Sequence, residues 1–519
     1  MELLNGFIVI FSQPTTMLFI VLGAILGVIV GAVPGLTASA AIAMLVPITY
    51  YIDPLSALAF LYVIGKAGRF GGSICAILFN TPGTTAAAAT IIDGYALTER
   101  GQAGKALKTA SLASAIGDFT GEILLICGAL TIAQFTRKLG PPEYFAVYVC
   151  AFLIIGSVIA DSLLKGIVST FLGAMLAVVG IDPITGEPRF DFGMIELYNG
   201  LSLVPLLIGL FVVSEVFIQA TKAKAEQEHH DEVKPREPGD DRLSLAEVKR
   251  CLPFIGKGSL IGSVVGLFPG VGSAVACFVA YGEGKRKAEN KEQWGKGAIE
   301  GVAAPEAANN AVSGPSMIPL LALGVPGSTI AAMLMGVFMI HGIQVGPQIF
   351  QVSGDIVYGL FASGLLGIVL YFLIGWFGAA YIGRVLDRVP TNLIYPSILA
   401  VAFISAYTAR SSLFDVGAAC VFGVVGYFMR ALNFSTAATV IAFVLAPGAE
   451  QSLRQSLLLS DRGYLVFLDR PVALAFFGIA FTAIALRLYG RTRSKRAAQA
   501  KPASGEPASG QPASGQPAA

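Results

Sequence analysis

A glycine- and proline-containing segment near the N-terminus decides the fold, and it reads Gly23-x₃-Gly27-x₃-Gly31-x₂-Pro34-Gly35. The segment recurs in the second half of the chain as Gly258-x₃-Gly262-x₃-Gly266-x₂-Pro269-Gly270. Its register is constant, because 258 − 23 and 270 − 35 both equal 235. A second pair of breaks follows, Pro82-Gly83-Thr84 and Pro326-Gly327-Ser328. Breaks at corresponding positions of two apolar halves are typical of the binding site of a secondary transporter.

Close packing of membrane helices is the alternative explanation for Gly-x₃-Gly spacing, since small residues let two helix backbones approach each other. We expect that explanation to hold for the three glycines of each copy. It does not account for a Pro-Gly break that recurs in register, so the breaks themselves are the candidates for function.

The composition is that of a membrane protein. Of 519 residues, 55% are hydrophobic and only 13% are charged, and the mean hydropathy is +0.72. Soluble domains carry about 25% charged residues, because their outside faces water. The sequence therefore predicts an all-α protein that crosses a membrane many times. A net charge of +2 gives no electrostatic reason to expect a nucleic-acid partner, and the six cysteines form no C-x-x-C pair.

A polar stretch divides the chain into two similar halves. We expect a first membrane repeat over 1–220, a polar cytoplasmic linker over 221–252, a second repeat over 253–490, and a basic, then low-complexity and disordered tail over 491–519. The apolar runs predict roughly 12 crossings. The two repeats are expected to be inverted, which requires an odd number of crossings in the first half. Basic clusters beside the apolar runs, the last at 491–496, predict a cytoplasmic C-terminus.

The first break contains the residues Asn80-Thr81-Pro82-Gly83-Thr84. Proline cannot continue a helix without freeing a carbonyl, and glycine permits a turn. Two half-helices that meet here would expose backbone groups at membrane depth, which is tolerated where those groups face a cavity or protein. The N-terminus of the following half-helix, expected over 84–90, offers N–H groups to a carboxylate. The freed carbonyls and the side chains of Asn80, Thr81 and Thr84 suit Na⁺, a hard cation.

The second break, Pro326-Gly327-Ser328, offers the same groups. Two ordinary proline kinks are the alternative. Because the breaks occupy related positions in both halves, we predict opposed tips around a central substrate site, with Thr84 and Ser328 contacting carboxylate.

Lys66 and Arg69 lie between two apolar runs, expected over 55–65 and 70–92. Cations there are costly unless they are paired or functional. A pathway for anions would use Arg69 as a bidentate fork and Lys66 as a point charge. The alternative is a loop at the membrane surface, from which both side chains reach water.

Glu306 precedes Asn309 and Asn310 by three and four residues, so on a helix the three share a face. A buried carboxylate with two amides could hold a cation or a proton. The alternative is a helix start, with Pro305 near its first position and Glu306 favoured by the helix dipole. Other acidic residues in or near apolar segments are functional candidates by default, although Asp93-Gly94 is typical of a turn: Asp93, Asp118, Glu122, Asp161 and Glu215.

Signatures of enzymes are absent. The chain has no Walker A motif, no H-E-x-x-H and no G-x-S-x-G. We therefore expect neither an ATP-driven pump nor a membrane-embedded enzyme.

Several of these motifs together resemble a known family, the large membrane subunit of tripartite tricarboxylate transporters (TctA-type). One signature region is similar to Pro34-Gly35-Leu36-Thr37, the segment from Gly71-Gly72-Ser73-Ile74 to Pro82-Gly83-Thr84, and Asp93-Gly94-Tyr95. The second is similar to Glu300–Ala311 and Leu323–Ser328. The resemblance covers residues of about 5–490. The sequence differs from the family pattern at 66–70, where the family usually carries small or apolar residues and a tyrosine. Lys66 and Arg69 are therefore either specific to this chain's substrate or mark a divergent branch.

The resemblance implies a multi-pass transporter of the bacterial cytoplasmic membrane, driven by an ion gradient. Such systems pair the large subunit with a small membrane subunit and a periplasmic substrate-binding protein. We therefore expect secondary active uptake of an organic di- or tricarboxylate, coupled to Na⁺ or H⁺ and without another cofactor. A carboxylate channel or exporter that acts without a binding protein is the alternative.

Overall fold

The computed structural model describes residues 2–136, 138–158, 162–182, 184–226, 241–386 and 391–499. Over these ranges the chain is predominantly helical, as the composition predicts. The strands described are two residues long: β1 (Gly180–Ile181) pairs antiparallel with β2 (Pro188–Arg189).

Ten α-helices form the first half: α1 (Glu2–Ser12), α2 (Pro14–Ala32), α3 (Ala38–Leu45), α4 (Pro54–Phe79), α5 (Ala88–Glu99), α6 (Ala103–Thr136), α7 (Pro141–Val158), α8 (Leu163–Ala177), α9 (Leu203–Leu207) and α10 (Ser214–Glu226). Three short turns of helix accompany them: η1 (Val46–Tyr51), η2 (Ile195–Leu197) and η3 (Ile208–Val213). The turn η3 joins α9 to α10 in one continuous apolar span.

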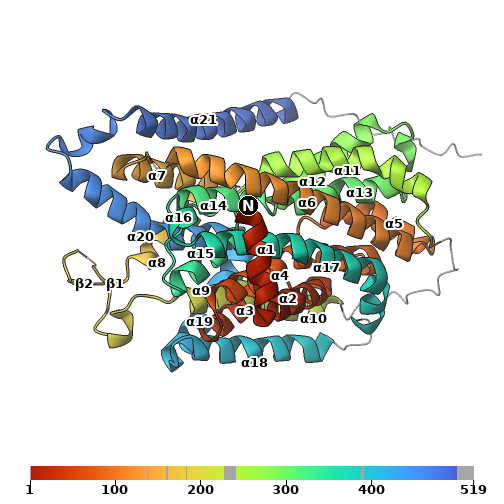
Figure 1. Cartoon of the computed structure of the whole chain (residues 1–519), viewed down its shortest axis with the longest axis horizontal. Helices are drawn as coiled ribbons and strands as arrows, with labels where there is room; N and C mark the ends of the chain where they lie inside the picture. The colour runs from red at the N-terminus through yellow and green to blue at the C-terminus, as the bar shows by residue number, and fades with distance from the viewer. Residues whose placement is uncertain are drawn as a thin grey trace, which may run out of the picture.

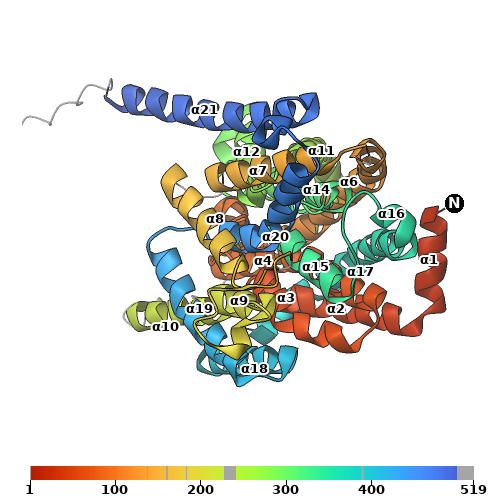
Figure 2. The same cartoon turned by 90° about the vertical axis from the view of Figure 1, so that its left-hand side faces the viewer.

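The second half contains α11 (Leu245–Gly266), α12 (Gly272–Lys287), α13 (Ile299–Ala311), α14 (Ile318–Leu323), α15 (Thr329–Ile340), α16 (Ile349–Val352), α17 (Gly354–Leu386), α18 (Thr391–Arg410), α19 (Leu413–Ala431), α20 (Thr436–Leu458) and α21 (Pro471–Gln499). Its short turns are η4 (Lys291–Gln293), η5 (Pro315–Met317) and η6 (Gly463–Phe467). Most helices lie roughly parallel to one long axis, with β1–β2 at one end of the molecule and α5 at the other (Figure 1). In a view turned by 90°, α21 and α18 lie at opposite edges (Figure 2).

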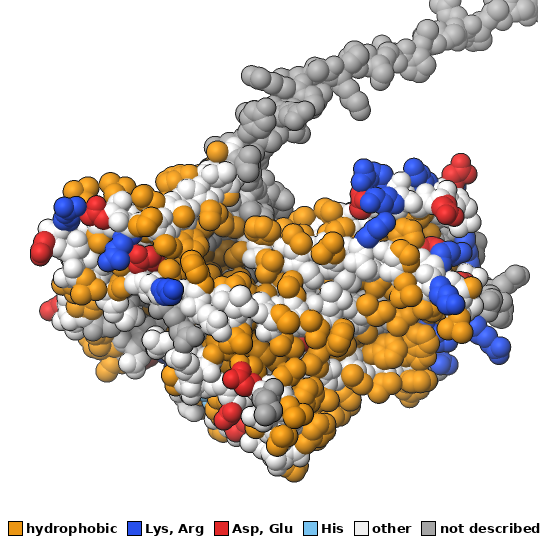
Figure 3. All heavy atoms as spheres, turned by 45° about the horizontal axis from the view of Figure 1, so that its top comes forward, with side chains coloured by type: hydrophobic (Ala, Val, Ile, Leu, Met, Phe, Trp, Pro, Cys, Tyr) orange, Lys and Arg blue, Asp and Glu red, His pale blue; other side chains and the backbone are white. Residues whose placement is uncertain are grey.

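Among the described residues, seven helices are long and apolar enough to cross a membrane, and six shorter apolar helices accompany them. The seven are Pro14–Ala32, Pro54–Phe79, Ala103–Thr136, Leu203–Thr221, Gly354–Val385, Leu393–Arg410 and Leu413–Ala431. Apolar side chains cover much of the face between the two ends, and Lys and Arg side chains gather at one of those ends (Figure 3). These features are those of a multi-pass membrane protein.

The three glycines of each copy of the opening motif lie against a neighbouring helix. A Cβ added to Gly23, Gly27 or Gly31 of α2 would come within 3.0 Å of a carbonyl oxygen of α4, those of Phe60, Ile64 and Gly68. A Cβ added to Gly258, Gly262 or Gly266 of α11 would likewise come within 3.0 Å of a carbonyl oxygen, those of Ala304, Ala308 and Val312. These glycines therefore permit close helix packing, which the spacing predicted.

The contacted carbonyls keep a constant register of their own, because 304 − 60, 308 − 64 and 312 − 68 all equal 244. Later helices are also spaced alike: α18 and α19 begin 250 positions after α7 and α8 (391 − 141 and 413 − 163). The hairpin β1–β2 lies between α8 and α9, in residues 178–202, whereas α19 is joined to α20 by residues 432–435 alone.

Three sequence-based expectations are wrong in detail. The runs 55–65 and 70–92 are not separate, because α4 continues from Pro54 to Phe79 through Lys66 and Arg69. Asp93-Gly94 is not a turn but lies inside α5. The helix after the first break begins at Ala88, not at 84. In α4 the many glycines, which favour a break when read alone, instead permit close packing against α2 and other neighbours.

The expected linker, 221–252, contains the end of α10 and the start of α11, whose Ser244 and Glu247 form a capping box. Residues 227–240 of the linker and 500–519 of the tail lie outside the described residues.

Candidate functional site

The first break folds the chain back along α4 before α5 begins, which brings Gly83 beside Gly72 of α4. The backbone of Asn80 is left-handed, with φ of 54°, and it ends α4. The hydroxyl of Thr84 then accepts a hydrogen bond from the N–H of Ala87 at 3.2 Å. A Cβ on Gly83 would lie 2.7 Å from the Cα of Gly72, so only glycine fits at this point. We call residues 80–84 tip 1.

The second break repeats this geometry between α14 and α15. Gly324 is left-handed with φ of 71° and ends α14. The hydroxyl of Ser328 accepts a hydrogen bond from the N–H of Ala331 at 3.2 Å. Gly327 again approaches a backbone, that of Ser316, and its carbonyl accepts a hydrogen bond from the N–H of Gly270 at 3.1 Å. We call residues 324–328 tip 2.

The two tips correspond position by position. The left-handed residues, the close glycines and the capping hydroxyls are each 244 positions apart (324 − 80, 327 − 83 and 328 − 84). The neighbours of the glycines keep that spacing, since 316 − 72 is also 244. Ordinary proline kinks do not produce such a set, because a kinked helix continues beyond the proline.

Buried charges lie in the helices that lead to the tips. Lys66 of α4 is fully buried, and its Nζ lies 2.5 Å from Oδ1 of Asp118 and 2.8 Å from Oε2 of Glu122, both in α6. The Tyr62 hydroxyl donates to Glu122 at 2.7 Å and the Tyr371 hydroxyl to Asp118 at 3.2 Å. Lys66 is therefore paired inside the protein, and it does not lie in a surface loop.

Arg69 lies one turn further along α4. Its Nη1 donates to the carbonyl of Asn309 at 3.4 Å. Its Nε is buried and has no hydrogen-bond partner in the part of the chain that the structure describes. This guanidinium therefore keeps donor capacity that the described residues do not use.

Glu306 lies inside α13, not at its start, and Pro305 is likewise interior. The carboxylate is fully buried and accepts hydrogen bonds from three hydroxyls: Ser73 at 2.6 Å, Thr90, and Ser114 at 3.0 Å. The helix-start interpretation of this segment is therefore wrong. The three hydroxyls come from α4, α5 and α6, and together they hold the Glu306 side chain of α13.

Asn309 and Asn310 are both buried near this carboxylate. Asn310 Nδ2 donates to the backbone carbonyl of Glu306 at 3.2 Å. Asn309 Nδ2 and Asn310 Oδ1 have no hydrogen-bond partner among the described residues. Buried amides are normally satisfied, so these two atoms mark a polar spot that protein contacts alone do not complete.

Asp93 has a positioning role that the sequence did not indicate. Its Oδ1 accepts 2.8 Å hydrogen bonds from the N–H groups of Gly295, Gly297 and Ala298, and its Oδ2 accepts one from the hydroxyl of Tyr281. The carboxylate therefore ties α5, which follows tip 1, to the loop that enters α13.

The structure thus brings Arg69, Glu306, Asn309 and Asn310 together where α4 crosses α13, whereas Lys66, one turn earlier in α4, contacts two carboxylates of α6. The contributions of Ser73, Thr90, Ser114, Tyr62 and Tyr371 were missed, because isolated hydroxyls in apolar runs carry no pattern. Asp118 and Glu122 were visible as acids four residues apart in an apolar run, but their cation lies 52 and 56 positions away (118 − 66 and 122 − 66).

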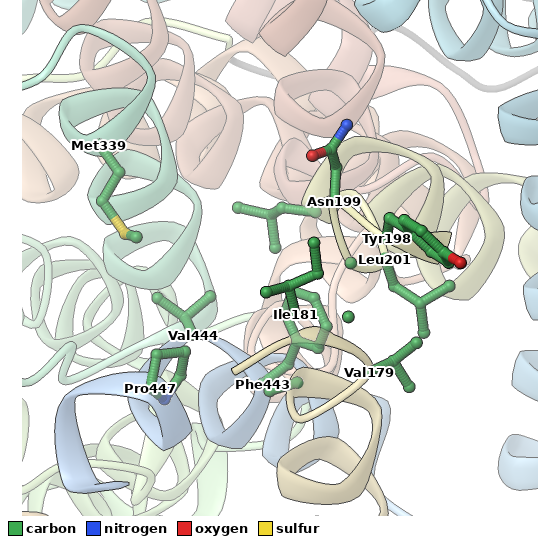
Figure 4. Close-up of a pocket in the computed structure, with 13 residues that line it drawn as sticks. Val179, Ile181, Tyr198, Asn199, Leu201, Met339, Phe443, Val444 and Pro447 are labelled. Atoms are coloured by element: carbon green, nitrogen blue, oxygen red, sulfur yellow. The ribbon is translucent and has the colours of Figure 1, made fainter. Parts of the chain in front are cut away.

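A separate cavity of about 490 Å³ lies elsewhere, and none of the predicted site residues lines it. Its walls come from the end of α8, β1, the loop before α9, α15 and α20 (Figure 4). Most of the lining side chains are apolar, and the polar side chains among them are those of Asn199 and Tyr198.

This fold, in which broken helices form paired tips within a many-helix apolar bundle, is that of a multi-pass membrane transporter. The chain belongs to the tripartite tricarboxylate transporter TctA family, whose model matches residues 17–441. The predicted resemblance is confirmed.

Two relatives, both from Agrobacterium vitis, are similar to the chain. The uncharacterised 52.8 kDa protein in the TAR-I ttuC' 3' region is 34% identical over 483 residues, which cover 93% of this chain and 95% of that protein. The uncharacterised protein in the TAR-II ttuC' 3' region is 34% identical over 235 residues, which cover 45% of this chain and 97% of that protein. No solved structure matches the chain.

Proposed function

We propose that this chain is the transmembrane carrier for an organic di- or tricarboxylate, taken up with Na⁺ or H⁺ from a periplasmic binding protein and together with a small membrane subunit. The observation that carries the proposal is the pair of matching tips in a chain of the TctA family. At tip 2 the N-terminus of α15 presents backbone N–H groups and the Ser328 hydroxyl, and at tip 1 the Thr84 hydroxyl caps the turn that leads to α5. Such groups suit a carboxylate.

The two halves are proposed to be inverted structural repeats. In support, each half contains the same parallel pair of helices. Successive glycines of α2 contact successive carbonyls of α4, and the glycines of α11 contact the carbonyls of the α13 segment in the same order. Where α4 crosses α13 they run in opposite directions, because Arg69 contacts Asn309 and Ser73 contacts Glu306. An inverted pair places the two tips on opposite approaches to one central site, which alternating access requires.

The proposed substrate contacts are the tip residues Asn80, Thr81, Pro82, Gly83, Thr84, Pro326, Gly327 and Ser328, with Lys66 and Arg69 behind them. Arg69 is the better placed cation, because its Nε lacks a partner among the described residues. The ammonium of Lys66 already contacts Asp118 and Glu122, so a substrate would have to displace one of those carboxylates. Asn309 and Asn310 provide polar lining.

The test is uptake of a panel of labelled carboxylates into cells that express the chain with its two partner proteins. Saturable uptake of one compound that needs the partners and an ion gradient is expected. A Na⁺ gradient and a proton gradient, applied separately, identify the coupling ion. Uptake that requires neither a gradient nor a binding protein would overturn the proposal in favour of a channel.

A further inference from the structure

Unlike Asp118 and Glu122, which both contact Lys66, the Glu306 carboxylate is held by hydroxyl groups and by no cation among the described residues. Its Oε1 accepts from Ser73 and Thr90, and its Oε2 accepts from Ser114. All four side chains are at most 1% exposed. Among the described residues no Lys, Arg or His forms an ion pair with it.

The charges of the surrounding cluster do not balance. Lys66 and Arg69 supply two positive charges, whereas Asp118, Glu122 and Glu306 carry three carboxylates. Lys66 contacts both Asp118 and Glu122, whereas none of the described cations forms an ion pair with Glu306, so Glu306 is the carboxylate of this cluster that has no cation beside it. An ionised carboxylate at membrane depth is costly without a counter-charge, and one bound monovalent cation would make the cluster neutral.

The oxygens around Glu306 suit such a cation. Three hydroxyl oxygens and two carboxylate oxygens converge there. The Oδ1 of Asn310, in the next turn of the same helix, is buried and accepts no hydrogen bond from the part of the chain that the structure describes. Hydroxyl and carboxylate oxygens are ligands for a hard cation, and they are equally partners for a protonated carboxyl. The shared chemistry is neutralisation of Glu306 by one H⁺ or one Na⁺.

The position of the carboxylate connects this charge to tip 1. Ser73 lies in α4 before the break, and Thr90 lies in α5 after it. Both hydroxyls meet the same oxygen of Glu306, so this carboxylate holds the two arms of the tip together. A change in its charge would change how firmly it holds them.

We propose that Glu306 is the ion-coupling residue, which takes up one monovalent cation within the cradle of Ser73, Thr90 and Ser114 and thereby controls tip 1. This inference rests on the proposed function. It names the site at which the driving ion acts and leaves the substrate open.

The main experiment uses Glu306→Gln in vesicles that contain the chain and its two partner proteins. Glutamine keeps the shape and one acceptor oxygen, replaces the other oxygen with an NH₂ group that donates to a hydroxyl turned towards it, and removes the ionisable charge. Two rates are measured: accumulation against a concentration gradient, and exchange of labelled for unlabelled substrate when no ion gradient is present. Exchange should stay within about twofold of the unaltered protein while accumulation falls to background, because a permanently neutral residue no longer needs the ion.

Separate arms identify the ion. One applies a pH gradient in Na⁺-free medium, and the other applies a Na⁺ gradient at equal pH. The gradient that drives the unaltered protein should no longer drive Glu306→Gln. Glu450→Gln is the matched control, because Glu450 has Arg189 and Arg454 as its own cations and lies outside the cluster, and it should accumulate substrate normally.

A second variant keeps the inference testable if Glu306→Gln does not fold. Ser114→Ala removes one hydroxyl from the cradle and should weaken the apparent affinity for the driving ion about tenfold, with the exchange rate unchanged. Normal gradient-driven accumulation by Glu306→Gln, or an unchanged ion affinity in Ser114→Ala, would overturn the inference. If the unaltered protein moves no carboxylate under any gradient, the proposed function fails, and this inference fails with it.

Discussion

Tip 1 and tip 2 have the same backbone but different surroundings. Each ends a helix in a left-handed residue, brings a glycine against a neighbouring backbone and caps the next segment with a hydroxyl. In tip 1, however, Asn80, Thr81 and Pro82 are exposed, whereas in tip 2 the residues from Gly324 to Gly327 are buried.

The difference teaches that local sequence forms the tips but packing decides which one is covered. Tip 2 is enclosed by its neighbours: Gly270 binds the carbonyl of Gly327, and a Cβ on Gly324 would contact the carbonyl of Val345. Two chemically similar tips in unequal surroundings are what an alternating-access carrier presents when one approach is open and the other closed.

Replacing the close glycine of either tip should have the largest effect. Gly83→Leu and Gly327→Leu each place a side chain where even a Cβ would lie within 3.0 Å of backbone atoms. We expect uptake to be abolished while the protein still inserts, because the overpacking is local. Uptake and the amount of protein in the membrane are measured together, and normal uptake by both variants would remove the tips from the mechanism.

The arms of the tips differ in charge, and this difference predicts the next largest effect. In the second half of the chain, the position equivalent to Lys66 is Asn310 of α13 (310 − 66 = 244). The buried ammonium therefore lies in the helix that leads to tip 1, and the equivalent helix of the second half has an amide there. Lys66→Ala would leave Asp118 and Glu122 facing each other without a cation, which should cost about 3–5 kcal/mol of stability. Thermal unfolding of the purified protein in detergent measures this cost.

A matched triple variant tests the cause. Lys66→Met combined with Asp118→Asn and Glu122→Gln removes the charges on both sides and should recover much of the stability that Lys66→Ala loses. If Lys66→Ala unfolds at the same temperature as the unaltered protein, the ion pairs of Lys66 do not stabilise the fold.

The unequal burial of the tips predicts unequal chemical access. In a background without the exposed thiols of Cys127 and Cys420, Thr81→Cys should react with a polar maleimide at least about tenfold faster than Val325→Cys. A local opening that costs about 1.4 kcal/mol and must precede labelling of Val325→Cys slows its reaction about tenfold. Equal rates in the purified protein would contradict the asymmetry, and a carboxylate that equalises them would show that the substrate shifts it.

The smallest effect is expected in the β1–β2 hairpin, which has no counterpart among the described residues of the second half. The N–H of Ile184 and the guanidinium of Arg454 lower the pKa of Asp182 to about 2. A carboxylate with a lowered pKa stabilises the fold above its unfolded value, near 3.9, and this contribution is lost as the pH falls towards 2. Asp182→Asn should therefore lower the melting temperature slightly at pH 7, and the difference should shrink from pH 4 downwards. A difference independent of pH would assign the effect to geometry alone.

Periodicity and breaks were sufficient to predict the helical membrane fold, the packing of Gly23, Gly27 and Gly31, and the positions of both breaks. They failed within α4, because a lysine, an arginine and several glycines in an apolar run favour a loop when read alone. In the structure those glycines approach α2 and the lysine meets two carboxylates of α6. The partners lie far away in the chain, and no local pattern reveals them.

The sequence by itself determined that the protein lies in a membrane, that it is helical and where the two tips lie. Composition acts through hydration, whereas proline and glycine act through local backbone geometry. Only the tertiary structure decided that Lys66 is paired, that Glu306 has three hydroxyl partners and no cation among the described residues, and that tip 2 is covered while tip 1 is exposed. The physical reason is that electrostatic matching and burial depend on which helices meet, and helices as distant in the chain as α4 and α13 meet only in the folded protein.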